Sequence, residues 1–151
     1  HSSNRRQRQM CIRDSFWSDE KGGTEMMELT QDVSWIAVIV GCGTGIFGGW
    51  AWYSPIGLGN RWAQGLGIDM GGKPPVTPMM LQGLGLFLLS WFVAVTAASC
   101  ALMTLLLGAL GFVVLGYSGE SFAGHTPAVR LINSGYWVLA VVVMILTNAA
   151  L

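Results

Sequence analysis

The side chains that could bind a ligand lie in the few polar segments of an otherwise apolar sequence. Arg61 lies in the first such segment, and Arg130 and Asn133 lie at the start of the last apolar stretch. Guanidinium and amide groups hydrogen-bond anions such as phosphates. These three residues therefore form a candidate polar site for an anion or a lipid head group. The alternative is that the arginines only anchor the chain at the membrane surface and set its topology.

Acid–base, nucleophilic and metal chemistry find less support. Asp69, Glu120 and His125 are the polar residues that could exchange a proton, but their spacing matches no recognised catalytic pattern. The three cysteines form no C-x-x-C pair, and the two histidines have no third metal ligand at a useful spacing. We therefore expect no catalytic residue, no metal site and no cofactor, and a non-enzymatic protein rather than an enzyme.

The composition determines the class of protein. The chain has 151 residues, of which 52% are hydrophobic and 11% charged, whereas about a quarter of an ordinary soluble domain is charged. The formal net charge is zero, but most of the charges lie in residues 1–32. Residues 33–151 carry only Arg61, Asp69, Lys73, Glu120 and Arg130. So few charges exclude a soluble globular domain and a nucleic-acid-binding protein, and they predict an integral membrane protein whose main partner is the lipid bilayer.

Charge-free stretches locate the membrane spans. They cover residues 33–60, 79–119 and 131–151. About 20 apolar residues suffice to cross a bilayer, so the middle stretch is about twice too long for one helix and should turn near residues 96–100. The sequence thus predicts an all-α, polytopic membrane protein, an up-down bundle of four transmembrane helices at about 34–52, 79–98, 101–117 and 131–149. If the middle stretch formed one span, there would be three.

Proline and polar residues indicate where the helices begin and end. Thr77-Pro78 and Thr126-Pro127 each combine a capping hydroxyl with a proline suited to the first helical position, so helices should start at Pro78 and Pro127. Pro55 should end the first span. The following Arg61-Trp62 pair fits a short helix at the depth of the lipid head groups.

Small residues recur every four positions along the first span, at Ala37, Gly41, Gly45 and Gly49. Such a ridge lets two helix backbones approach closely inside a membrane. Its partner could be another span of the same chain or a second copy, so the ridge predicts helix packing and leaves homo-oligomerisation open.

The first 32 residues form a polar tail that we expect to be disordered, ahead of a transmembrane domain at 33–151. Residues 7–15 resemble a translated sequencing adaptor, which would move the natural start to Met26 or Met27. Orientation depends on this tail. Its five basic residues favour a cytoplasmic N-terminus, whereas without them Arg61, Lys73 and Arg130 favour cytoplasmic loops and external termini.

Three segments resemble a known family. They are the turn Trp52-Tyr53-Ser54-Pro55, the following Gly59-Asn60-Arg61-Trp62, and residues 131–136, which read LINSGY. Together they resemble a family of small, mainly bacterial membrane proteins catalogued as domain of unknown function 1761, over about residues 33–151. The resemblance implies a four-helix, multi-pass protein of the bacterial cytoplasmic (inner) membrane, and no activity. The connection between the second and third spans is shorter than in the family pattern.

Three functions remain open from the sequence. The first is a membrane protein that acts through helix packing or oligomerisation. The second is a small-solute transporter or channel subunit, although the predicted spans lack the ionisable residues that transporters use for coupling. The third is a membrane enzyme acting on lipid or quinone, which would have to use Asp69, Glu120 or His125.

Overall fold

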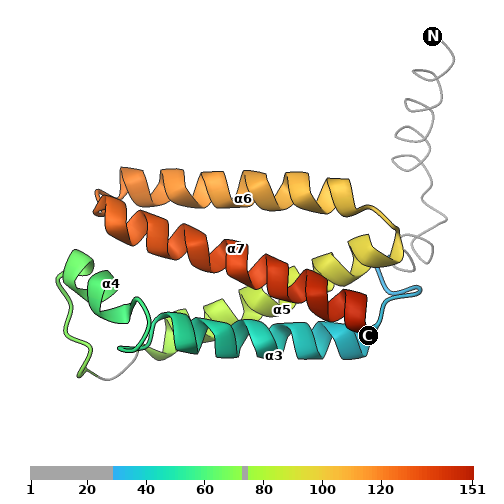
Figure 1. Cartoon of the computed structure of the whole chain (residues 1–151), viewed down its shortest axis with the longest axis horizontal. Helices are drawn as coiled ribbons and strands as arrows, with labels where there is room; N and C mark the ends of the chain where they lie inside the picture. Colours follow the sequence, from blue (N-terminus) through green and yellow to red (C-terminus); the bar gives the residue numbers. More distant parts are fainter. Residues whose placement is uncertain (1–28, 73–74) are drawn as a thin grey trace, which may run out of the picture. The chain divides into compact units, whose positions relative to one another are not determined.

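The computed structural model describes residues 29–72 and 75–151, and the regular elements of this part of the chain are all helices (Figure 1). They are α3 (Trp35–Trp52), α4 (Gly59–Leu66), α5 (Val76–Ala98), α6 (Leu102–Phe122) and α7 (Pro127–Ala150). Four of them, α3, α5, α6 and α7, are long and apolar enough to cross a membrane. This confirms the all-α, four-span prediction over the three-span alternative. Residues 1–28, which hold the adaptor-like segment and most of the predicted tail, lie outside the described residues.

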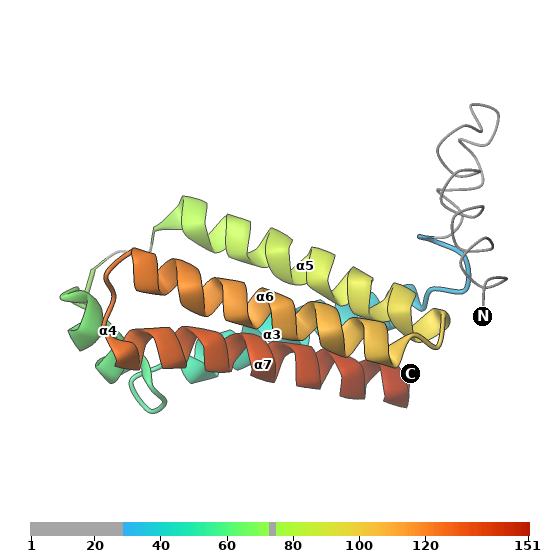
Figure 2. The same cartoon turned by 90° about the horizontal axis from the view of Figure 1, so that it is seen from above.

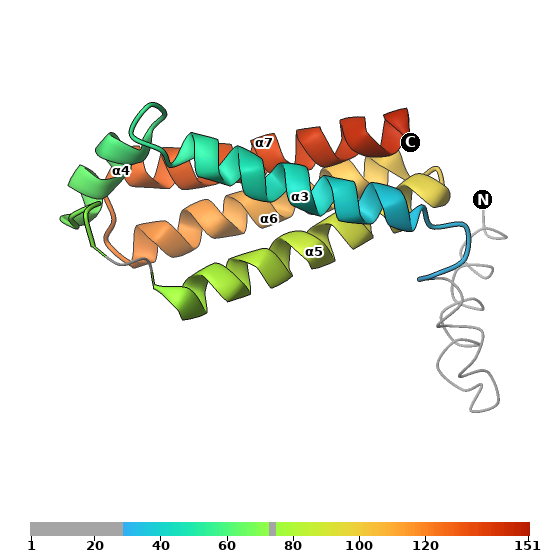
Figure 3. The ribbon, with the colours of Figure 1, turned by 90° about the horizontal axis from the view of Figure 1, so that it is seen from below.

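Residues 32–151 form one compact unit in which the long helices run alternately up and down (Figures 1 and 2). The short helix α4, the start of α5 and the α6–α7 turn therefore lie at one end of the bundle. The α5–α6 turn and the C-terminus lie at the other end. In Figure 3, α3 runs between α7 and α5, the two helices against which it packs. The polar segments around Arg61 and Arg130 consequently lie at the same end of the bundle.

One of the two predicted helix starts is correct. α7 begins at Pro127, and the side chain of Thr126 accepts a hydrogen bond from the Val129 N–H, as the Thr-Pro pair predicts. α5 begins earlier than predicted, at Val76, and it has no side-chain cap. The prediction that Thr77 caps this helix is therefore wrong, since the helical backbone already includes that residue.

The third span is longer than its apolar stretch. α6 continues to Phe122 instead of ending near residue 117, so Glu120 lies within the helix and not in a loop. The helix ends where Gly124 adopts a left-handed conformation and the N–H of His125 bonds to the Glu120 carbonyl. A charged residue does not end a helix that has reached the membrane surface, whereas a left-handed glycine does.

The turn between α5 and α6 contains a left-handed residue that is not glycine. Cys100 has φ 51°, its N–H bonds to the Ala97 carbonyl, and the N–H of Ala101 bonds to the Thr96 carbonyl. These two bonds form a Schellman motif, which normally places glycine at this position. A residue with a Cβ atom is strained there by about 1 kcal/mol.

We predict that Cys100→Gly raises the free energy of unfolding by about 1 kcal/mol, because glycine adopts this conformation without strain. Cys100→Ala is the matched control, since it removes the thiol and keeps the Cβ atom. Reversible unfolding in detergent micelles, followed by circular dichroism, measures both. An equal gain in the two variants would show that the thiol and not the backbone is responsible.

The small residues of α3 lie against α5 and α7 of the same chain. Ala37, Gly41 and Gly45 are buried. A Cβ atom added at Gly41 would lie 2.5 Å from Ser90 Oγ on α5, and one at Gly45 would lie 3.1 Å from Met144 Cε on α7. The ridge predicted from the sequence is thus occupied within the chain, and it presents no free surface to a second copy at these positions.

Two hydrogen bonds join the helices along this contact. Ser90 Oγ donates to the Val38 carbonyl at 2.9 Å, and Tyr136 OH donates to the Gly45 carbonyl at 3.1 Å. A Cβ atom at Gly49 would lie 2.9 Å from the same Tyr136 hydroxyl. The missing side chains therefore let two buried hydroxyls reach backbone carbonyls, which satisfies polar groups in a region without water.

We predict that Gly41→Ala lowers the free energy of unfolding by about 1–3 kcal/mol, because the added methyl group overlaps the buried Ser90 hydroxyl. Gly43→Ala is the control, since a Cβ atom there meets nothing within 4 Å. Denaturant titrations of the two variants in the same micelles compare them directly. Equal stabilities would contradict this packing of α3.

α6 is the least covered of the four long helices. Only 6% of its span is buried, compared with 22–39% of the other three. Its apolar contacts with the bundle include those of the buried Leu105 and of Phe112, whose ring centroid lies 5.1 Å from that of Trp137 on α7. Most of the α6 surface is therefore left to lipid or to another protein.

Candidate functional site

The segment after α3 folds into a compact turn that carries the Trp52-Tyr53-Ser54-Pro55 sequence. The N–H of Leu58 bonds to the Trp52 carbonyl at 2.8 Å, and the N–H of Gly59 bonds to the Ser54 carbonyl at 3.1 Å. A Cβ atom at Gly59 would lie 2.1 Å from the Tyr53 carbonyl oxygen, so the turn requires glycine there. α4 begins directly after this close approach.

This turn docks onto the first part of α7. Trp52 Nε1 donates to the Ile132 carbonyl at 3.0 Å, and Tyr53 OH donates to Asn133 Oδ1 at 3.0 Å. A Cβ atom at Gly135 would lie 3.2 Å from the Trp52 ring, so glycine makes room for the indole. The turn and residues 131–136, which both carry the family resemblance, are thus in direct contact although 80 residues separate them.

α4 covers the outside of this turn. A Cβ atom at Gly65 would lie 2.4 Å from Val129 Cγ2, which shows how closely α4 approaches α7. Trp62 packs edge-on against Tyr53, with ring centroids 5.2 Å apart. Its Nε1 is buried and has no hydrogen-bond partner among the described residues. The predicted short helix therefore forms, and it packs an aromatic side chain over the site.

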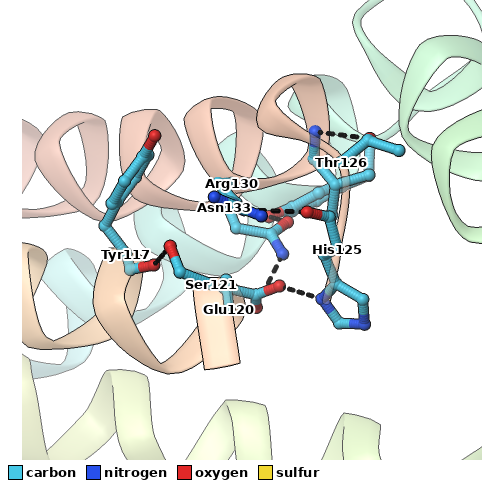
Figure 4. A network of polar contacts seen from close by, with 9 residues as sticks. Tyr117, Glu120, Ser121, His125, Thr126, Arg130 and Asn133 are labelled. Atoms are coloured by element: carbon cyan, nitrogen blue, oxygen red, sulfur yellow. Dashed lines mark hydrogen bonds and ion pairs between the residues drawn. The ribbon is translucent and has the colours of Figure 1, made fainter. Parts of the chain in front are cut away.

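Glu120 is the centre of a polar network at this end of the bundle (Figure 4). Its Oε1 accepts a hydrogen bond from Asn133 Nδ2 at 2.9 Å, and its Oε2 contacts His125 Nδ1. Because Asn133 also accepts from Tyr53, one carboxylate connects the end of α6, the α6–α7 turn, α7 and the end of α3. Charge-assisted hydrogen bonds of this kind are among the stronger polar contacts in proteins.

His125 is held at several atoms. Its N–H donates to the Glu120 carbonyl at 3.2 Å, its carbonyl accepts from Arg130 Nε at 2.8 Å, and its Nδ1 contacts the Glu120 carboxylate. Its remaining polar atom, Nε2, has no partner in the described part of the chain. The imidazole is thus fixed in orientation with one nitrogen available.

Tyr53 contributes a neutral hydroxyl to the network. Burial raises the pKa of Tyr53 above its ordinary value, and nearby Tyr136 and Glu120 raise it further. The phenol therefore stays protonated and remains a hydrogen-bond donor to Asn133 at every physiological pH.

The three residues of the predicted polar site lie in different surroundings. Arg130 and Asn133 belong to the same network around Glu120 and His125. Arg61 is exposed on α4, and no hydrogen bond or ion pair joins its side chain to another described residue. Nothing in the sequence connects Tyr53, Glu120 and His125 to this site. Glu120 and His125 stood out only as residues that could exchange a proton, and Tyr53 only as part of the Trp52-Tyr53-Ser54-Pro55 turn.

The described side chains of the network do not supply the ligands of a metal ion. Among residues 29–72 and 75–151, no three His, Cys, Asp or Glu side chains come close enough together to hold a metal ion. Instead, the hydrogen bond between a carboxylate and one imidazole nitrogen determines which of the two nitrogens carries the proton.

Four apolar helices with a polar network at one end define a polytopic helical membrane protein. The chain belongs to the family described as Protein of unknown function (DUF1761), whose family model matches residues 36–148. No curated protein and no solved structure matches the chain. The match covers all four long helices almost completely, as the resemblance of the turn and of residues 131–136 led us to expect.

We predict that Glu120→Ala lowers the free energy of unfolding by about 1–3 kcal/mol, because it leaves the part-buried Asn133 amide and His125 Nδ1 without their acceptor. Asp69→Asn is the control, since the Asp69 carboxylate bonds only within its own loop, to the Gly71 N–H. Denaturant unfolding in micelles measures both. A loss no larger in Glu120→Ala than in Asp69→Asn would show that the network does not hold the helices together.

Proposed function

We propose that this chain is a membrane subunit that assembles with further copies of itself through the outer face of α6. The small burial of α6 is the observation that carries this proposal. The exposed leucines of α6 include Leu107, Leu110 and Leu115. Two exposed glycines, Gly111 and Gly119, lie four residues before and after Leu115 and so share its side of the helix. A Cβ atom at either glycine would meet nothing within 4 Å.

Exposed glycine is better suited to a helix partner than to lipid. It lets two helix backbones come close enough for extensive dispersion contacts. Such close packing drives association in a membrane, because lipid chains are as apolar as the helix surface and hydrophobicity alone favours neither partner. On α3 the comparable row of glycines is already covered by α5 and α7. The sequence left open whether the α3 ridge meets a second copy, and the proposal assigns self-association to α6 instead.

The other two functions have narrower support. A passive pore built from several copies is compatible with α6 self-association. A coupled transporter is less so, because the described spans carry charge only at Glu120 and Arg130, near the helix ends. The contact between Glu120 and His125 favours an enzyme, but in the described residues no hydroxyl or thiol nucleophile hydrogen-bonds to His125.

The same proposal assigns the chain to the bacterial cytoplasmic membrane, on the strength of the resemblance to a mainly bacterial family. It orients α4 and the α6–α7 turn toward the cytoplasm, because Arg61, Lys73 and Arg130 all lie in or beside these connections.

We predict that Gly111→Leu weakens self-association in vesicles by at least about tenfold, or 1.4 kcal/mol, because the leucine keeps the two backbones apart. Gly43→Leu is the matched control, since Gly43 is also exposed and open but lies on α3. Energy transfer between labelled copies, measured as the lipid-to-protein ratio increases, gives the dissociation constants. A wild-type chain that is monomeric at every ratio would refute the proposal, as would an equal effect of Gly43→Leu.

A further inference from the structure

We propose that His125 Nε2 is a binding site for a neutral hydroxyl group at the membrane surface, oriented by Glu120. The other polar atoms of His125 are all engaged: the N–H by the Glu120 carbonyl, the carbonyl by Arg130 and Nδ1 by the Glu120 carboxylate. Nε2 alone has no partner among the described residues. The His125 side chain is 35% exposed, so a ligand can reach it.

The carboxylate determines what Nε2 can bind. A carboxylate only accepts hydrogen bonds, so the neutral imidazole must carry its proton on Nδ1. Nε2 is then an unprotonated nitrogen that accepts a hydrogen bond from an O–H or N–H group. The Asn133 amide on the other carboxylate oxygen fixes Glu120 and with it the orientation of the ring (Figure 4).

The charges around the imidazole favour a neutral ligand. Arg130 lies against the His125 carbonyl and disfavours a cationic group such as an ammonium head group. Glu120 in contact with the ring disfavours an anion such as a phosphate. Because the two charges oppose each other, the ligand that fits is a neutral donor, and a hydroxyl is the common one.

The position at the end of the bundle points to lipid as the source of this hydroxyl. Glu120 lies in the last turn of α6, and His125 lies directly before α7, where membrane-spanning helices reach the head groups. A lipid with a free hydroxyl on its glycerol or sugar would present this group at that depth. A soluble polyol carries the same chemistry, and a comparison of a hydroxyl-bearing lipid with free glycerol separates the two sources.

Nuclear magnetic resonance of the full chain with ¹⁵N-labelled histidine, in phosphatidylcholine nanodiscs, tests the site. His125→Gln identifies the His125 signals against those of His1. We expect the Nδ1–H tautomer in the free protein and a saturable shift of the Nε2 signal when diacylglycerol, a hydroxyl-bearing lipid, is added to the disc. Free glycerol at the same hydroxyl concentration should cause at most about a fifth of this shift. A larger response to glycerol than to diacylglycerol would overturn the lipid assignment.

Two variants test the role of Glu120. Glu120→Gln retains a hydrogen-bonding group but can donate to Nδ1, so the tautomer should reverse to Nε2–H and the response to diacylglycerol should be lost. Asp69→Asn should behave like the wild type. If neither lipid nor glycerol shifts Nε2 in the wild type, or if Glu120→Gln keeps the wild-type tautomer and response, the proposal is wrong. Circular dichroism confirms that each variant has folded.

Discussion

The close approach of α3 to α5 and α7 is the contact on which the rest of the bundle depends. It exists because Gly41 and Gly45 carry no side chain where Ser90 and Met144 come close. Without water or a hydrophobic driving force between helices in lipid, close packing and hydrogen bonds between helices must supply the stability. The hydrogen bond from the Tyr136 hydroxyl to the Gly45 carbonyl combines close packing with hydrogen bonding, since the glycine makes the carbonyl accessible to the phenol.

The polar end of the molecule follows from the same packing. Once α3 and α7 are in contact, Trp52 and Tyr53 at the end of α3 reach Ile132 and Asn133 on α7. Asn133 then connects this pair of helices to Glu120 and so to α6, whose apolar contacts with the bundle are few. Packing in the membrane thus positions the network, and the network in turn holds the end of the loosely covered helix.

The sequence predicted what local patterns determine. The four spans follow from charge-free stretches, and the start of α7 follows from its Thr-Pro pair. Other features depend on contacts between distant segments or on competing local choices. Thr77 has the residue type of a cap, but the helix already begins at Val76. The meeting of Glu120 with His125 required knowing that α6 runs past its apolar stretch to a left-handed Gly124. Similarly, the four-residue spacing of the small residues on α3 could not show whether they pack against the same chain or against a second copy.

The most direct test of this packing is a cross-link between α3 and α5 that leaves the glycines of α3 unchanged. Trp35→Cys on α3 and Trp91→Cys on α5 are combined in a chain whose native cysteines are replaced by alanine, because the centroids of the two native rings lie 5.5 Å apart. A short bifunctional thiol reagent is then applied in native-like membranes. We expect a cross-link within one chain, recovered as an intact monomer whose two cysteine-containing peptides are joined. A covalent dimer with no intrachain product would contradict it.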